Sequence, residues 1–190
     1  MGFKISVIPD HPIYDSLPAV KIGSYQNPVP EDYRPFAQGR LAFGQEGFYL
    51  QLIAFEVTVS PFSRLRAEFS ADGKKYFSLL IKESGLDEFS VWEKGELLWR
   101  DDEAAETVPI HGEDLQGEYW GGQALIPYET LLRIWPDFTF EAGKTIRGNL
   151  YKYSGDPKWK HWGSFYPIAH WDQENPFGEH GFGNFELVSY

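Results

Sequence analysis

The sequence has 190 residues, of which 42% are hydrophobic and 24% charged, and its formal net charge is −11. This composition excludes an intrinsically disordered chain, and a chain of this length can bury a core within one domain. The negative charge disfavours phosphate backbones and anionic lipid surfaces, so no nucleic-acid partner is expected, and the lack of cysteine excludes disulfides, thiolate nucleophiles and cysteine-ligated metals.

The chain begins with a proline-rich stretch, residues 1–38. Because proline interrupts strand ladders, this stretch predicts an irregular N-terminal arm that packs on the domain, with one short edge strand over 19–22. Residues 1–9 hold too short an apolar run for a signal peptide, and no apolar stretch is long enough to span a membrane. We expect a cytoplasmic protein without a membrane partner, or a secreted protein if a secretion signal has been removed.

From residue 39 onward apolar and polar residues alternate, and this period of two indicates β-strands. Asp72-Gly73 and Lys94-Gly95 each lie between two such segments and predict tight hairpin turns. A proline at each end brackets the one predicted helix, over 127–135. The predicted strands cover residues 40–43, 48–57, 64–70, 75–81, 88–92, 96–99, 119–127, 145–153 and 183–188.

Acidic residues concentrate between 87 and 106, where eight of them occur. Two interpretations stay open: a solvated surface that blunts a sheet edge, or a site for a divalent cation. The 17% aromatic content, with 19 Gly and 13 Pro, is typical of many short strands joined by tight turns. We therefore predict an all-β fold over residues 1–190, an antiparallel β-sandwich with jelly-roll or immunoglobulin-like layers and one short helix.

Four segments toward the C-terminus carry a family resemblance. They read GGQALIPYETLL (121–132), RGNLYKY (147–153), HWGSFYPI (161–168) and FGNFEL (182–187). In order and approximate spacing they resemble family 9 carbohydrate-binding modules and their DOMON-like relatives. Two positions depart from the family pattern, since Phe165 stands where tryptophan is frequent and 177–180 reads FGEH where the family has Phe-His-x-Pro. The N-terminal half matches only loosely, around 67–73.

The resemblance implies a non-catalytic module that recognises a mono- or oligosaccharide in an aromatic-lined cleft. In this family two aromatic side chains sandwich a terminal sugar, while Arg, Glu, Asn and Gln side chains bond its hydroxyls. The resemblance also leaves room for structural calcium held by loop carboxylates and carbonyls, and no other cofactor is expected. The sequence does not indicate which sugar is bound or how many copies of the chain associate.

Sugars expose apolar C–H faces and hydroxyl groups, so a sugar site needs flat aromatic surfaces edged by planar donors and acceptors. Residues 149–171 hold seven aromatic side chains among lysines and histidines. We predict that Trp162 and Trp171 form the aromatic surfaces of a cleft. The predicted ligand-binding residues are Trp162, Trp171, Trp120, Asn149, Tyr151, Arg66, Glu68 and His170.

Each tryptophan has a structural alternative, in which it fills the core or packs a loop. For three tryptophans the core is the favoured interpretation: Trp92, Trp99 and Trp135. Asn149, in the middle of a predicted strand, bonds either a ligand hydroxyl or a neighbouring loop backbone.

The charged candidates have alternatives too. Arg66 and Glu68 lie two residues apart on one strand face and form either a surface ion pair or a pair that binds hydroxyls. His161 and His170 either cap a ligand or are hydrogen-bonded structural residues.

Other function classes remain open. A sugar-active hydrolase needs two carboxylates roughly 5–10 Å apart, and the 28 acidic residues stand in no recognisable catalytic motif. A structural or protein-interaction β-sandwich needs no ligand. A haem-binding DOMON-like domain needs axial ligands, and because the one methionine is Met1, only a histidine pair qualifies.

Overall fold

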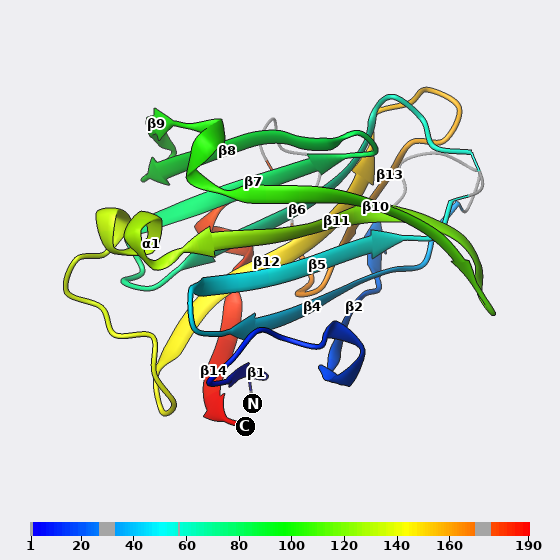
Figure 1. Cartoon of the computed structure of the whole chain (residues 1–190). Coiled ribbons are helices and arrows are strands. Elements are labelled where there is room, and N and C mark those ends of the chain that lie inside the picture. The colour runs from blue at the N-terminus through cyan, green and yellow to red at the C-terminus, as the bar shows by residue number, and fades with distance from the viewer. Residues whose placement is uncertain (1, 27–32, 57, 170–175) are drawn as a thin grey trace.

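Alternating side chains and tight turns build most of this chain from β-strands. The computed structural model describes residues 2–26, 33–56, 58–169 and 176–190. They form a 14-stranded sheet with one α-helix at its edge (Figure 1). The strands are β1 (Phe3–Val7), β2 (Ala19–Ile22), β3 (Ser24–Gln26), β4 (Ala37–Phe43), β5 (Gly47–Ala54), β6 (Ser63–Ser70), β7 (Lys75–Lys82), β8 (Gly85–Glu93), β9 (Glu96–Arg100), β10 (Glu106–Asp114), β11 (Gly117–Pro127), β12 (Thr145–Ser154), β13 (His161–Ser164) and β14 (Gly183–Ser189). The helices are α1 (Tyr128–Ile134) and three 3₁₀ turns at Tyr14–Ser16, Asp102–Ala104 and Glu179–Gly181.

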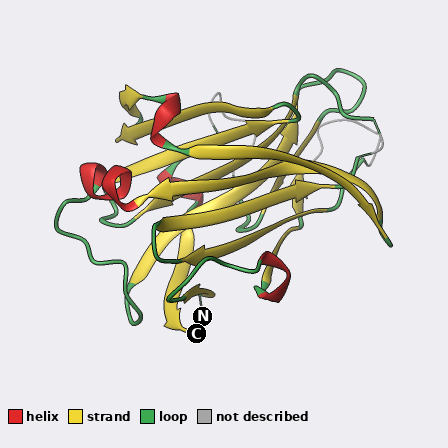
Figure 2. Cartoon of the chain, viewed as in Figure 1, coloured by secondary structure: helices red, strands yellow, loops and turns green. Residues whose placement is uncertain are grey.

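Eleven of these strands follow one hydrogen-bonded path, β10-β11-β5-β4-β1-β14-β12-β6-β7-β8-β9, and the sheet curls on itself (Figure 2). The other three branch from it, since β2 pairs with β4, β13 with β12, and β3 with β13. Curling brings β5 over β6 and β7. The Phe48 ring of β5 lies 5.1 Å from that of Phe69 in β6 and 6.4 Å from that of Phe77 in β7. Because aromatic rings from two layers meet in the core, the predicted all-β sandwich with one short helix is confirmed.

Strand β1 joins the two layers. It pairs in parallel with β14 over its whole length and with β4 through Ser6 and Val7. Two expectations therefore change, because the sheet is not antiparallel throughout and because residues 3–7 form a central strand rather than part of an irregular arm. The short edge strand expected over 19–22 is confirmed as β2, which pairs with β4.

The turn cues were informative. Gly73 (φ 69°), Lys94 (φ 50°) and Gly95 (φ 80°) adopt the left-handed backbone of the tight turns that separate β6 from β7 and β8 from β9. The predicted strands match observed ones, although β5 ends at Ala54. Strand β10 was not predicted, because nearly all its side chains are exposed or half-buried and its hydrophobic alternation is weak.

Of the three tryptophans favoured as core residues, one is confirmed. Trp135 is 3% exposed, whereas Trp92 and Trp99 are half-buried. Within the part of the chain that the structure describes, no helix is long and apolar enough to cross a membrane.

Acidic side chains of the 87–106 segment form ion pairs with basic side chains of β6, β7 and β9. Asp87 lies 2.8 Å from Arg64 and 2.9 Å from Lys82, and Glu88 lies 2.5 Å from Arg100. Among the described residues, no group of three or more His, Cys, Asp or Glu side chains is arranged to hold a metal ion. These contacts favour the solvated-surface interpretation of this segment.

Candidate functional site

Strands β6, β12 and β13 send every second side chain to the side of the sheet away from the core. The register pairs Tyr151 with Arg66 and Asn149 with Glu68 across β12 and β6. Strand β13 adds Trp162, whose partner on β12 lies two residues after Tyr151 and so points the same way. Five predicted ligand residues therefore share one surface, which we name the aromatic face.

The charged pair of the aromatic face is covered. Arg66 Nη2 lies 2.7 Å from Glu68 Oε1, and the Glu68 side chain is 0% exposed. The guanidinium carbon of Arg66 lies 4.1 Å from the centre of the Phe177 ring, and the Gly178 amide donates to Glu68 Oε2 at 2.9 Å. Burial, together with the Glu68 charge, holds the pKa of the Tyr151 phenol well above its usual range. The expected ion pair between Arg66 and Glu68 is present, but its expected surface position is wrong, because residues 177 and 178 pack over it.

Asn149 fastens two loops to the aromatic face. Its amide nitrogen donates to the carbonyls of Tyr166 at 2.9 Å and Gly181 at 2.8 Å, and its Oδ1 accepts from the Tyr166 amide at 2.9 Å. Both amide hydrogens are thus used by the protein's own backbone. The geometry favours the loop-bonding alternative for Asn149.

Trp162 is the tryptophan that remains accessible on the aromatic face. Its half-buried ring packs against the small apolar cluster of Tyr151 and Ile168. Lys160 Nζ lies 4.7 Å from the centre of the ring. This arrangement leaves part of a flat apolar surface in contact with solvent.

The other aromatic and histidine candidates differ. Trp120 is 1% exposed and donates through Nε1 to Glu56 Oε2 at 2.8 Å. Its proposed place in a ligand cleft is corrected, since β11 turns this side chain into the interior. Trp171 and His170 lie outside the described residues.

An ionic cluster lies in the interior beside Trp120. Lys152 Nζ is 3.1 Å from Glu56 Oε2 and 2.9 Å from His161 Nε2. His161 Nδ1 lies 2.6 Å from the Trp159 carbonyl, which only accepts, so Nδ1 carries the proton and Nε2 accepts from the lysine ammonium. His161 is thus a hydrogen-bonded structural residue.

Burial shifts two pKa values in this cluster. Desolvation lowers the pKa of Lys152 to about 8, and the neighbouring Glu56 carboxylate opposes that change. Desolvation, reinforced by the Lys152 charge, lowers the pKa of His161 to about 3. At neutral pH the cluster therefore holds a charged lysine and an uncharged imidazole.

A hollow of about 430 Å³, which we name the end pocket, opens above this cluster. Its walls include the rings of Tyr33 and Trp159, whose centres are 5.2 Å apart, and Trp159 is 37% exposed. Glu56 and Ser63, both nearly buried, line it as well. Among the described residues, the lining consists of Tyr33, Phe55, Glu56, Thr58, Ser60, Ser63, Lys158 and Trp159.

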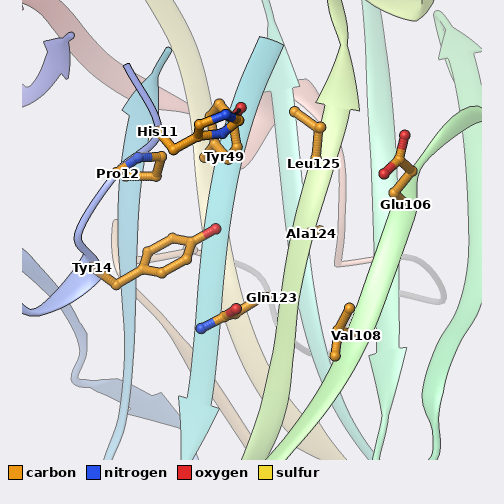
Figure 3. Close-up of a pocket in the computed structure, with 9 residues that line it drawn as sticks. All are labelled: His11, Pro12, Tyr14, Tyr49, Glu106, Val108, Gln123, Ala124 and Leu125. Carbon is orange, nitrogen blue, oxygen red and sulfur yellow. Dashed lines mark hydrogen bonds between the residues drawn. The ribbon is translucent and has the colours of Figure 1, made fainter. Parts of the chain in front are cut away.

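A second hollow of about 260 Å³, the face hollow, lies on the opposite layer over β5, β11 and β10 (Figure 3). Tyr14, Gln123 and Val108 lie across these strands in Figure 3. At one side the Tyr49 hydroxyl lies 2.9 Å from both Glu46 Oε2 and His11 Nδ1. The polar groups of Tyr49, Glu46 and His11 thus lie at the rim of the face hollow.

Sequence reasoning missed Glu56 and Tyr33. Glu56 follows the apolar run 52–55, and an acid at the end of a buried strand was an available but weak signal. Tyr33 falls in the proline-rich stretch and gave no signal. Trp159 belonged to the aromatic window of 149–171 without being selected from it.

Solved structures resemble this chain over nearly its whole length, whereas no family model and no curated protein matches it. A candidate carbohydrate-binding protein from Bacteroides uniformis superposes with a TM-score of 0.70 at 17% identity, over 98% of this chain and 100% of its own. A family 9 carbohydrate-binding module from Caldicellulosiruptor kristjanssonii in complex with cellotriose gives a TM-score of 0.64 at 10% identity, over 98% and 94%. The module from that organism in complex with glucose gives 0.65 at 10%, over 98% and 96%. The chain has the fold of family 9 carbohydrate-binding modules, as the four sequence segments implied.

Proposed function

We propose that this chain is a non-catalytic carbohydrate-binding module that holds a mono- or oligosaccharide on its aromatic face. The observation that carries the proposal is the half-buried indole of Trp162, which lies on the same side of the sheet as the partly exposed Arg66 side chain. The fold adds support, because the two solved family 9 structures that share it hold cellotriose and glucose.

The chemistry of this face suits a sugar. A partly exposed indole such as Trp162 offers a flat apolar surface to the C–H face of a sugar ring. The Arg66 side chain is 16% exposed, so a hydroxyl reaches its edge while Glu68 and Phe177 hold it in place. Because these groups are fixed before binding, little side-chain freedom is lost when a ligand arrives.

Calorimetric titration with glucose, cellobiose and cellotriose tests this proposal. We expect Trp162→Leu to weaken binding by about tenfold, since an aromatic anchor contributes about 1–2 kcal/mol. Trp99→Leu is the matched control, because Trp99 is also half-buried but lies on β9, where Arg133 covers its ring at 4.2 Å.

Equal affinities for the wild type and Trp162→Leu would remove the indole from the site. The absence of binding to every sugar would favour the structural or protein-interaction alternative. Release of reducing sugar from mixed polysaccharides would contradict the non-catalytic part of the proposal and favour a hydrolase.

A further inference from the structure

The end pocket has an unusual acceptor in its wall. The two oxygens of Glu56 differ in their partners. Oε2 accepts from Trp120 Nε1 at 2.8 Å and contacts Lys152 Nζ at 3.1 Å, and both partners lie behind the pocket. Among the described residues, Oε1 accepts from the hydroxyls of Tyr33 and Ser63, each at 3.5 Å, the outer limit of a hydrogen bond, and lies 4.0 Å from His161 Nε2.

Oε1 is the oxygen that faces the hollow, because Tyr33 and Ser63 both line it. Glu56 is 5% exposed, and a carboxylate oxygen removed from water needs a close donor. A ligand hydroxyl standing in the end pocket supplies such a donor. The bond is charge-assisted, so it is stronger than one between neutral groups.

The charge balance of the end pocket indicates a neutral ligand. Lys152 compensates Glu56 from behind. At the rim, Asp156 Oδ2 accepts from Ser60 at 2.7 Å, and the pKa of Asp156 is lowered chiefly by that bond and also by the Lys158 charge, so an acid and a base lie near each other there. A charged ligand therefore finds no unmatched counter-charge among these groups.

Size and wall chemistry narrow the ligand class. A volume of about 430 Å³ falls within the range of small-molecule sites, about 300–1,000 Å³. The rings of Tyr33, Phe55 and Trp159 suit the apolar face of a sugar, and the hydroxyls of Ser60 and Ser63 suit its polar edge.

We propose that the end pocket is a second ligand site, separate from the aromatic face, which takes one ring of a neutral sugar and receives a ligand hydroxyl on Glu56 Oε1. Glu56 is the specificity-determining acceptor, and Lys152 and Trp120 hold its carboxylate in position. The ligand class rests on the proposed function, whereas the site itself rests on the geometry of the pocket.

Indole N–H signals in a ¹⁵N-edited NMR spectrum test the two sites separately. The chain has seven tryptophans, and single Trp→Phe substitutions assign their signals. Trp159 and Trp120 report on the end pocket, the latter through its bond to Glu56, and Trp162 reports on the aromatic face. Glucose, xylose, galactose and cellotriose are the titrants.

We expect the Trp159 and Trp120 signals to shift together along one saturating curve. Trp159→Leu, a change in an exposed loop, is expected to weaken that curve about three- to tenfold while the Trp162 curve is unchanged. Glu56→Gln alone leaves the buried Lys152 without a counter-charge. The acceptor is therefore tested with the double variant Glu56→Gln/Lys152→Met. That variant is expected to weaken the end-pocket curve about tenfold or more.

Distinct outcomes separate this inference from the proposed function. Movement of Trp162 alone overturns the end-pocket site and leaves the aromatic face standing. Movement of Trp159 and Trp120 alone supports the end pocket and removes the aromatic face. If no indole signal shifts with any sugar, both the end-pocket site and the aromatic face are overturned. If the double variant binds in the end pocket as tightly as the wild type, the role of Glu56 is overturned.

Discussion

The end pocket and the face hollow use similar residue types in opposite ways. At the base of the end pocket, Glu56 and Lys152 behind it have side chains that are 2% and 0% exposed, and they lie 3.1 Å apart. Beside the face hollow, Glu46 and His11 have side chains that are 54% and 66% exposed, at 3.4 Å. Because the first pair is buried, removing one partner would strongly destabilise the fold, whereas water screens the second pair. The comparison teaches that a similar spacing of an acidic and a basic side chain has different consequences at the end of the sandwich and on its open face.

The two hollows arise from different parts of the strands. The face hollow lies over paired strand residues, Tyr49 of β5, residues 123–125 of β11, and Glu106 and Val108 of β10, where a regular ladder leaves little depth. The end pocket lies where β5 and β12 end and β6 and β13 begin, so loops build its walls. Loops at strand ends bring together side chains from distant segments, which a flat ladder does not do.

Removing the buried lysine charge tests the difference most strongly. Lys152→Met leaves Glu56 buried without its counter-charge, and we expect a loss of about 3–5 kcal/mol in the free energy of unfolding. Urea denaturation measures it, with Lys158→Met at the pocket rim as the control, expected within about 0.5 kcal/mol of wild type. A loss below about 1 kcal/mol for Lys152→Met would show that the buried pair does not act as one unit.

The pH dependence of stability tests His161. Its pKa is about 3 in the folded protein and about 6.5 when unfolded, so between these values only the unfolded chain binds this proton. Stability therefore falls as the pH drops from 6.5 toward 3, and we expect this group to contribute about 2–4 kcal/mol of that fall.

His161→Gln isolates this contribution, because glutamine offers an acceptor to Lys152 but does not titrate. Denaturation at a series of pH values should give a flatter profile for the variant between pH 6 and 4. Parallel profiles for variant and wild type would show that His161 is already protonated in the folded protein.

The smallest effect is expected in the face hollow. Glu46→Gln weakens an exposed pair with His11 and keeps an acceptor for Tyr49, so the loss should be below about 1 kcal/mol. Thermal unfolding at low and high salt checks this expectation. A loss comparable with that of Lys152→Met would erase the contrast between the two hollows.

Most of the fold could be predicted because its signals are local. Asp72-Gly73 and Lys94-Gly95 mark hairpins whose geometry depends on four or five neighbouring residues. Strand β1 escaped prediction because its five residues gain their place only by pairing with β14 and β4, far along the chain. Strand β10 escaped because it presents few apolar side chains.

The candidate site was harder to predict, since it depends on which side of each strand faces the core. The adjacent residues His161 and Trp162 belong to different sites, His161 to the buried cluster and Trp162 to the aromatic face. From the sequence alone, it could not be predicted which of the two side chains points into the core. Pairing between Glu56 and Lys152 depends on how loops close at the end of the sandwich, and no local pattern encodes that.

The parallel pairing of β1 with β14 also determines how the molecule bears mechanical load. The two chain ends leave this pair in opposite senses, from Phe3 at one end of the ladder and from Ser189 at the other. A force that pulls the termini apart therefore slides the strands past each other, and the hydrogen bonds of the ladder resist together instead of opening one by one. A module that is held by its two ends while it binds a ligand would thus be pulled in the direction in which this strand pair resists by shear.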